Sequence, residues 1–451
     1  METTASTRTP PVTPQTTTPP TPKPKMNLNL RLVVIILLVI IGITGIYFYY
    51  QFINKSASVT PPMPSPEMNS PTDLSTETPP NQADKLSSAY NSFGIEFLKN
   101  RVKGEQGKNI FISPASLEMA FSIAMMGAAP SVRAEMVKTL GFESASDSDI
   151  KDLSQQFLSQ ITKPDQDVTI SIANSIWTQI TAQIKPEFLS VNKEAFMARV
   201  QSLDLTTPAG IAVVNQWVSD QTRGKIKAIL DNPLLKEQIM VLVNAVYFKG
   251  KWTTPFDTKL TADQKFTTEN GISLITPFMV QTDSYKYLET NQFQAIQIPY
   301  GKGENWAMVI FLPKSDINTY LNFLTPANWS EWLSLFTLRD GTISLPKFKA
   351  EYKAKLPEIM RSLGMRSAFE TGDQFPGIAP LTYIAEGIHK TFVEVDEEGT
   401  EASAVTALLP VAGGGQNPEP PFTMTVNHPF LYAIVDTNTN MAVFLGIMQK
   451  P

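Results

Sequence analysis

The sequence contains no cysteine and only two histidines, His389 and His428. The absence of cysteine excludes disulfide bonds and thiolate metal sites. Two histidines leave almost no material for a multi-histidine zinc site or for a Ser-His-Asp triad. No Gly-rich phosphate loop and no paired catalytic carboxylates stand out either. We therefore expect no metal, no cofactor and no enzymatic activity.

The sequence also lacks a strong excess of charge of one sign. Lys and Arg number 37 against 42 Asp and Glu, a formal net charge of -5 over 451 residues. Nucleic-acid-binding proteins usually carry a basic patch, so we do not expect a nucleic-acid partner. What the chain does contain is apolar material: 42% of its residues are hydrophobic, enough to bury a large core at this length.

The N-terminal part differs in composition from the rest of the chain. Residues 1–31 are rich in Thr and Pro, which is typical of a disordered tail. Leu32–Tyr50 is an uncharged apolar run that would span about 28 Å as a helix, close to the thickness of a bilayer's hydrocarbon core. It predicts a transmembrane signal anchor over residues 32–52. Residues 53–83, rich in Pro, Ser and Thr, are interpreted as an extended linker.

Basic residues flank this apolar run unequally. Four precede it, and Lys55 is the only one close behind it; the four are Arg8, Lys23, Lys25 and Arg31. Because basic residues gather on the cytoplasmic side of a span, we expect a single-pass membrane protein with a cytoplasmic N-terminus and an extracytoplasmic domain. A cleaved signal peptide is the alternative, but the run is longer than a typical signal-peptide core and no A-x-A site follows.

Residues 84–451 read as one continuous mixed domain without a repeat or a second linker. Apolar residues at spacings of four, three and four predict an amphipathic helix; they are Leu86, Tyr90, Phe93 and Phe97. In Asn109–Ala128, a short apolar strand precedes Ser113-Pro114, a favourable start for the buried helix that follows. Val241–Trp252 is apolar on both faces, as expected for a strand in a covered sheet. The prediction is an α+β domain with large sheets.

Two strands are predicted at the C-terminal end of this domain. The segments TMTVNHPFLYAIVD and MAVFLGIMQ are rich in apolar and β-favouring residues and are joined by a turn at residues 437–440. We expect both to lie in the core.

The segment Glu394–Pro410, EVDEEGTEASAVTALLP, combines acids, a glycine and small residues. At a period of two, one face after Gly399 carries only small side chains; these are Thr400, Ala402, Ala404 and Thr406. A permanently exposed loop usually has polar turn-formers, and a permanently buried strand usually has larger side chains. The pattern indicates a segment that moves between the two states.

Five motifs follow one another along this domain: NIFISPASLEMAFSIAMMGA, NQWVSDQTRGKI, LVNAVYFKGKWTTPF, IHKTFVEVDEEGTEASA and VNHPFLYAI. With these motifs in this order, the domain resembles a serpin from about residue 84 to the end. The resemblance implies a serpin fold with large mixed β-sheets, about eight to nine helices and an exposed reactive-centre loop at about 397–422. It also implies that a protease cleaves this loop, whose N-terminal half then enters the main sheet as a new strand while the protease is still held as an acyl-enzyme.

The resemblance also implies roles for particular residues. The hinge of the loop is Glu397, Gly399, Thr400, Glu401, Ala402, Ser403, Ala404 and Val405. The shutter, a polar cluster beneath the main sheet, is Ser113, Ser116, Asn244 and His389, and the breach, where insertion begins, contains Trp252. Because the loop is expected to be exposed before cleavage, substitutions at Thr400 or Ala404 are expected to leave the uncleaved fold intact.

The position of the scissile bond has several candidates. The family's usual spacing from the hinge glycine implies Gly413 and Gly414, but this loop is longer than usual, so Ala412, Val411 and Leu409 remain alternatives. No Lys or Arg occurs between Gly399 and Pro429, so a trypsin-like pocket with a buried acid would find no partner charge. The expected targets are elastase-like or subtilisin-like serine proteases.

Two functions follow from the resemblance: a membrane-tethered suicide inhibitor of serine proteases, or a non-inhibitory serpin-fold binding or chaperone protein. Non-inhibitory members commonly carry bulky residues or proline in the hinge, and Gly399–Ala407 contains neither, which favours inhibition. The expected partner is the target protease. The helical stretch Lys151–Ile161 has a single base, so we expect no heparin site. We expect a monomer.

Overall fold

The structure is a computed structural model that describes residues 82–163, 166–400 and 420–451. The predicted tail, membrane anchor and most of the linker lie outside these residues, as do loop residues 401–419. Within the described ranges, no helix has both the length and the apolar character needed to cross a bilayer.

The described residues form nine α-helices, in agreement with the predicted number. They are α2 (Gln82–Gly104), α3 (Pro114–Met125), α4 (Pro130–Leu140), α5 (Asp147–Ile161), α6 (Pro186–Ala195), α7 (Pro208–Gln221), α8 (Ile317–Phe323), α9 (Pro326–Ser334) and α10 (Leu356–Leu363). The predicted amphipathic helix is α2, which buries Tyr90, Phe93 and Phe97.

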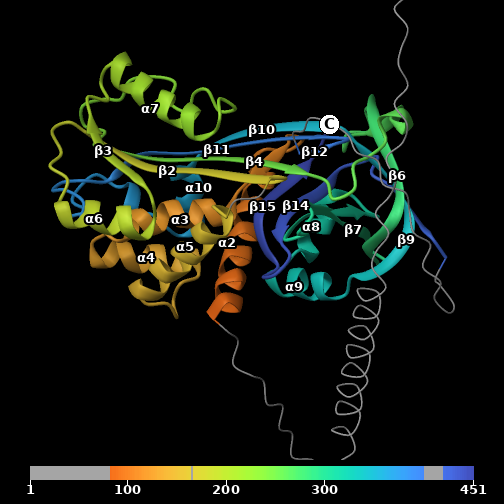
Figure 1. Cartoon of the computed structure of the whole chain (residues 1–451). Coiled ribbons are helices and arrows are strands. Elements are labelled where there is room, and N and C mark those ends of the chain that lie inside the picture. Colours follow the sequence, from red (N-terminus) through yellow and green to blue (C-terminus); the bar gives the residue numbers. More distant parts are fainter. Residues whose placement is uncertain (1–81, 164–165, 401–419) are drawn as a thin grey trace, which may run out of the picture. The chain divides into compact units, whose positions relative to one another are not determined.

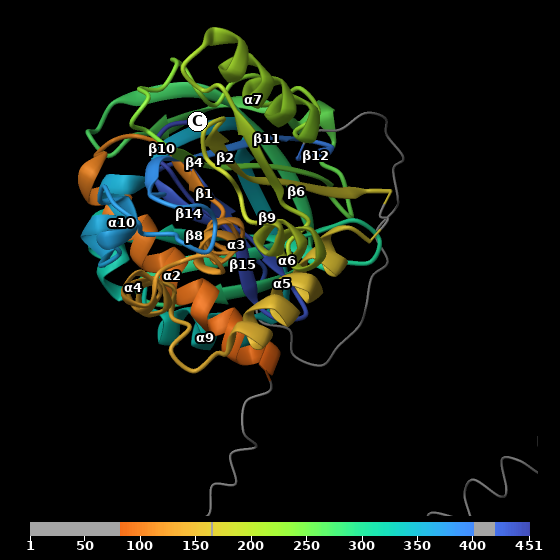
Figure 2. The same cartoon turned by 90° about the vertical axis from the view of Figure 1, so that its left-hand side faces the viewer.

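A six-stranded sheet runs through the upper part of Figure 1, in the order β10-β11-β12-β4-β2-β3. Its strands are β10 (Phe348–Lys355), β11 (Ile384–Asp396), β12 (Gly399–Thr400), β4 (Met240–Lys251), β2 (Val168–Gln179) and β3 (Arg199–Leu203). Helix α7 covers one face, and α3 packs against β2 and β4 on the other (Figures 1 and 2). Because both faces are covered, β4 is apolar on both, as its sequence predicts.

The second sheet of the domain has nine strands, in the order β1-β15-β14-β8-β7-β6-β9-β13, with β5 paired to β6. Its strands are β1 (Ile110–Ile112), β15 (Met441–Met448), β14 (Phe430–Asp436), β8 (Trp306–Pro313), β7 (Phe293–Tyr300), β6 (Ser273–Glu289), β9 (Thr337–Pro346), β13 (Phe422–Thr425) and β5 (Ala262–Thr267). The second predicted C-terminal strand is β15, but the first, residues 423–436, is divided between β13 at the edge of the sheet and β14 in its interior. Every residue of β14 and β15 is buried.

Helix α3 begins where the sequence predicts. Ser113 has extended backbone angles, its hydroxyl accepts a hydrogen bond from the Ser116 N–H, and Pro114 occupies the first turn. These are favourable features of a helix start. All twelve residues of α3 are buried, because the helix packs against β2 and β4 of the six-stranded sheet, against β15 of the other sheet and against helices α2 and α4. This position places Ser113 and Ser116 directly beneath the centre of the sheet.

Candidate functional site

Two neighbouring strands of the six-stranded sheet meet in an unusual way. β4 and β11 pair directly and in parallel, Met240–Tyr247 with Ile384–Phe392, but near Gly250 the two-residue strand β12 lies between them. β12 is antiparallel to both neighbours. We call the directly paired stretch the β4–β11 seam. The sheet therefore already holds the start of an additional strand at one end of this seam.

A tight turn leads from β11 into β12. The Asp396 carboxylate accepts hydrogen bonds from the N–H groups of Glu398 at 3.0 Å and Gly399 at 3.3 Å. Gly399 has a φ of +152°, and a Cβ atom there would lie 2.1 Å from the Gly250 carbonyl oxygen. Only glycine fits this position; the role of Gly399 as the hinge glycine stays a prediction.

Glu397 connects this turn to two other segments, the residue before β5 and the residue between β9 and β10. Its carboxylate accepts a hydrogen bond from Lys347 Nζ at 2.7 Å and another from Thr261 Oγ1 at 2.8 Å. Burial alone would raise the pKa of the Glu397 carboxyl. The hydrogen bond from Lys347 and those from the other donors together lower the pKa by more, so the net shift is downward. The ionised carboxylate is thus the form that the site stabilises.

An aromatic pair supports β12 from beneath. Trp252 stacks on Tyr300 with ring centroids 4.4 Å apart, and its Nε1–H donates to the Asp396 carbonyl at 2.9 Å. The Tyr300 and Thr400 hydroxyls lie 2.8 Å apart in a hydrogen bond. Trp252, predicted at the breach, therefore contacts Asp396 just before the hinge and stacks on the tyrosine that bonds Thr400.

The structure corrects the prediction of where the exposed loop begins and ends. Thr400 is 0% exposed and Glu397 is 8% exposed, because β12 is already paired on both sides. Phe422 at the far end is 4% exposed in β13. Residues 397–400 and 422 therefore belong to the packed domain, and the expectation that Thr400 is exposed before cleavage is wrong.

A row of three polar side chains crosses the middle of the sheet. Asn174 on β2 lies opposite Asn244 on β4, and Asn244 lies opposite His389 on β11. The Asn244 amide Nδ2 donates to Asn174 Oδ1, and its Oδ1 is hydrogen bonded to His389 Nδ1. Asn174 is 5% exposed and the other two are 0% exposed. We call these three residues the polar row.

Helix α3 supplies further partners for this row. Asn244 Nδ2 donates to the Ser116 carbonyl at 3.0 Å, and the Ser113 N–H donates to His389 Nε2 at 3.1 Å. Since Nε2 accepts, the proton of the neutral ring resides on Nδ1. Burial lowers the pKa of His389 to about 3, so the ring is neutral at physiological pH. The four predicted shutter residues therefore do come together.

Sequence reasoning missed three members of the site. Asn174 completes the polar row, Lys347 pairs with Glu397, and Tyr300 bonds Thr400. Asn174 is brought in by the pairing of β2 with β4, and the other two by contacts between segments far apart in the chain; no local motif marks any of the three. The remaining predicted residues lie outside the described ranges; they are Glu401, Ala402, Ser403, Ala404, Val405, Leu409, Val411, Ala412, Gly413 and Gly414.

The similarity to known proteins extends over almost all of the described residues. The family model described as Serpin (serine protease inhibitor) matches residues 88–451. Iripin-2 of Ixodes ricinus is 32% identical over 379 residues, 81% of this chain and 94% of that protein. Leukocyte elastase inhibitor of Sus scrofa is 30% identical over 386 residues, 82% and 100% of the two chains. The crystal structure of a thermophilic serpin, tengpin, in the native state matches with a TM-score of 0.74 at 29% identity, covering 86% of this chain and 97% of that one.

Proposed function

We propose a function from one premise, that this chain belongs to the serpin family. The proposed function is suicide inhibition of a serine protease. The protease cleaves the segment between β12 and β13, and the freed N-terminal part enters the β4–β11 seam as a new strand before the acyl-enzyme hydrolyses. In this mechanism the chain is cleaved once and stays covalently bound to the protease, so it is not proposed to be an enzyme.

The position of β12 is the observation that supports this proposal most directly. Gly399 and Thr400 already pair with both β4 and β11, so strand addition can continue from an existing end. The residues that would follow, Glu401–Ala407, contain no proline, and those on the Thr400 face, Ala402, Ala404 and Thr406, have small side chains. Small side chains enter a close-packed sheet without the cost of overpacking.

The test uses the full-length chain and a panel of serine proteases with elastase-like, subtilisin-like and trypsin-like specificity. We expect an SDS-stable complex with an elastase-like or subtilisin-like enzyme, and faster trapping of these than of trypsin. Sequencing the released C-terminal peptide identifies the scissile bond, which we place at Gly413–Gly414, with Ala412, Val411 and Leu409 as alternatives. Trapping of trypsin in preference to the others would contradict the assigned loop register.

The second candidate function is that of a non-inhibitory serpin-fold binding or chaperone protein. Its signature in the same experiment is loop cleavage by every protease without a covalent complex, and without a rise in thermal stability after cleavage. The fit of small residues after Thr400 favours inhibition. A complex with any member of the panel would therefore set this candidate aside.

We also propose that the domain is displayed outside the cytoplasmic membrane as a tethered monomer, on the strength of the apolar run Leu32–Tyr50 and the basic residues before it. Protease added to intact cells is expected to remove the domain. Protection of the domain in intact cells, with loss only after lysis, would reverse the proposed topology. Sedimentation of the detergent-solubilised chain tests the monomer.

A further inference from the structure

A groove lies between the C-terminal half of α2 and helices α8 and α10. Its volume is about 740 Å³, within the range of about 300–1,000 Å³ that small-molecule sites usually have. None of its described lining residues belongs to the hinge, the shutter or the breach. We call it the α2–α8 groove.

The lining of the α2–α8 groove is mostly polar. Three apolar residues contribute to it, Val102, Leu321 and Leu363, and its other described residues are charged or carry an amide or a hydroxyl group. Helices usually turn apolar faces toward one another, and α2 does so on its opposite side, where Tyr90 and Phe97 are buried. A fatty acid or a steroid would therefore gain little burial in the groove. No described lining residue offers an aromatic ring on which a nucleobase could stack.

Two asparagines in the lining are held in fixed orientations. Asn100 Nδ2 donates a hydrogen bond to Ser362 Oγ at 2.8 Å, and Asn318 Nδ2 donates to the Glu269 carboxylate. Because each amide nitrogen faces an acceptor in the protein, the side-chain oxygen of each asparagine is turned away from that acceptor. No described residue donates to either oxygen. Both asparagines can therefore accept hydrogen bonds from hydroxyl groups of a ligand.

Two lysines bring positive charge to the groove. Lys99 and Lys103 both line it, one helical turn apart on the same face of α2. Neither forms an ion pair with a described residue. Like charges at this spacing repel each other, and an anion between them would remove the repulsion and accept charge-assisted hydrogen bonds from both. Glu96 is the one acid among the described lining residues, and it can accept from a ligand hydroxyl.

We infer that the α2–α8 groove binds an anionic sugar of the uronate class. The sugar hydroxyl groups donate to the side-chain oxygens of Asn100 and Asn318, and the sugar carboxylate accepts from Lys99 and Lys103. A sugar offers neighbouring hydroxyl groups, each of which is both a donor and an acceptor, and this suits a lining of amide, hydroxyl and ammonium groups. The inference goes beyond the proposed inhibition and is tested without a protease.

Calorimetric titration of the full-length chain, in a detergent without a sugar headgroup, tests the ligand class. The probes are galacturonate, trigalacturonate, maltotriose and a triglutamate peptide. We expect trigalacturonate to bind about tenfold more tightly than maltotriose, which has hydroxyl groups but no carboxylate. Tighter binding of the trimer than of galacturonate identifies a polysaccharide as the source of the ligand, and equal affinities identify a free sugar acid. Tighter binding of the peptide than of trigalacturonate would overturn the assignment to a sugar.

Two variants test the lining of the groove. Lys103→Gln removes an ammonium group at an exposed position, and Asn100→Ala removes one acceptor. We expect Lys103→Gln to weaken trigalacturonate binding about tenfold, as the loss of a charge-assisted hydrogen bond implies. Asn100→Ala should weaken binding less, because the lost hydrogen bond joins neutral groups. Thermal unfolding verifies that each variant is as stably folded as the parent.

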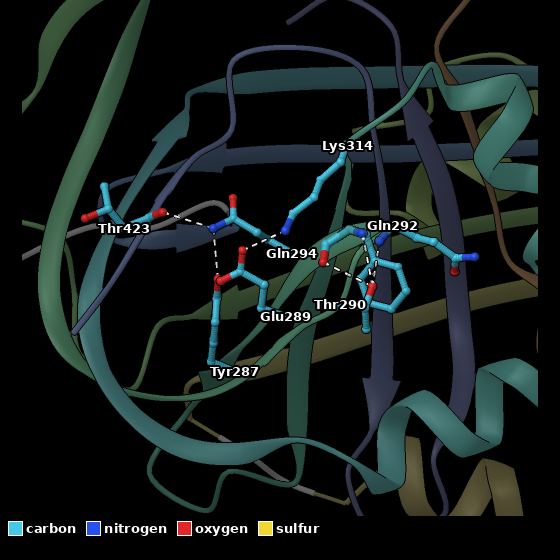
Figure 3. A network of polar contacts seen from close by, with 8 residues as sticks. Tyr287, Glu289, Thr290, Gln292, Gln294, Lys314 and Thr423 are labelled. Carbon is cyan, nitrogen blue, oxygen red and sulfur yellow. Dashed lines mark hydrogen bonds and ion pairs between the residues drawn. The ribbon is translucent and has the colours of Figure 1, made fainter. Parts of the chain in front are cut away.

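Lys314→Gln is the matched control, because Lys314 precedes α8 by a few residues but is not among the described lining residues. Its Nζ lies 2.8 Å from Glu289 Oε1, in a polar network that includes Tyr287 and Gln294 (Figure 3). The control removes the same charge and should bind trigalacturonate like the parent at physiological ionic strength, where exposed charges farther apart than about 8 Å are largely screened. If the parent does not bind trigalacturonate, or if Lys314→Gln and Lys103→Gln weaken binding equally, the inference is wrong.

Discussion

Replacing Thr400 by Arg tests whether β12 is the first step of strand insertion. The Thr400 side chain is fully buried between β4 and β11, and its hydroxyl bonds Tyr300. A buried arginine without a partner costs several kcal/mol after relaxation, and the extra volume adds about 1–3 kcal/mol of overpacking. The variant has two possible outcomes: β12 stays in the sheet with the arginine side chain buried, or β12 leaves the sheet.

The contacts of β12 decide this in favour of release. The strand has two residues, each paired on both sides, so only a few backbone hydrogen bonds are lost, at about 0.5–1.5 kcal/mol net each. The hydroxyl bond to Tyr300 adds about 1 kcal/mol. Release is then the less costly outcome, because the expelled groups regain water. The domain should stay folded with Gly399 and Arg at position 400 outside the sheet.

Trp252 provides a direct readout of release, because it stacks on Tyr300 and donates to Asp396 next to the hinge. In Thr400→Arg we expect altered tryptophan emission before loop cleavage. In the trapping assay, we expect many more molecules of this variant than of the parent to be cleaved for each protease molecule inactivated. Thr400→Ser, which keeps the hydroxyl, is the control and should behave like the parent. Unchanged emission together with unchanged trapping stoichiometry in Thr400→Arg would refute the reasoning.

Two further predictions concern buried titratable groups. Glu118 on α3 is 0% exposed, and neither carboxylate oxygen has a partner among the described residues. Burial raises the pKa of Glu118 well above the usual value. The contribution of the protonated carboxyl to folding stability is therefore present at low pH and is lost as pH rises above the unfolded pKa. Glu118→Met should raise the urea midpoint, and more at pH 8 than at pH 5; an equal gain at both would contradict the buried, protonated acid. For His389, whose pKa falls to about 3, the sign is opposite, because the unfolded state binds the proton first as pH drops below about 6.5. Stability should fall between pH 6.5 and 3, and His389→Gln should flatten this slope; an unchanged slope in the variant would assign it to other groups.

Much of the fold is predictable from local patterns. The helix start at Ser113-Pro114, the doubly covered strand β4 and the C-terminal strand β15 were all predicted, because capping residues and apolar periodicity act over a few residues. The resemblance to a family named Ser113, Ser116, Asn244 and His389 together, and these four lie together in the structure; their role as a shutter, like that of the hinge, stays a prediction.

The missing members of the site depend on long-range pairing. Asn174 reaches Asn244 because β2 and β4 are antiparallel in one register, and a shift of one residue would turn it to the other face. Lys347 and Tyr300 meet Glu397 and Thr400 from 50 and 100 residues away. The burial of Thr400 also depends on long-range pairing. Its small side chain is compatible with an exposed loop and with a buried strand, and only the pairing of β12 shows that it is buried in the uncleaved chain.

The register of β12 also predicts what an inserted loop brings to the polar row. Thr400 lies opposite Gly250 on β4 and Val395 on β11, so the same register carried six residues further sets Thr406 opposite Asn244 and His389, on the same face as Thr400. Insertion separates β4 from β11 by one strand spacing, about 4.8 Å, so the Asn244–His389 hydrogen bond must break.

A hydroxyl at position 406 would replace that bond, since it offers one donor and two acceptor sites. Thr406→Val keeps the shape and removes the hydroxyl, so the cleaved, inserted form should lose about 1–3 kcal/mol of stability. The uncleaved form should be unaffected, because Asn244 and His389 bond each other there. The measurement is the urea midpoint of loop-cleaved and uncleaved protein, with Thr406→Ser as the control that keeps the hydroxyl. Equal stability of cleaved Thr406→Val and cleaved parent would show that the loop does not enter the seam in this register.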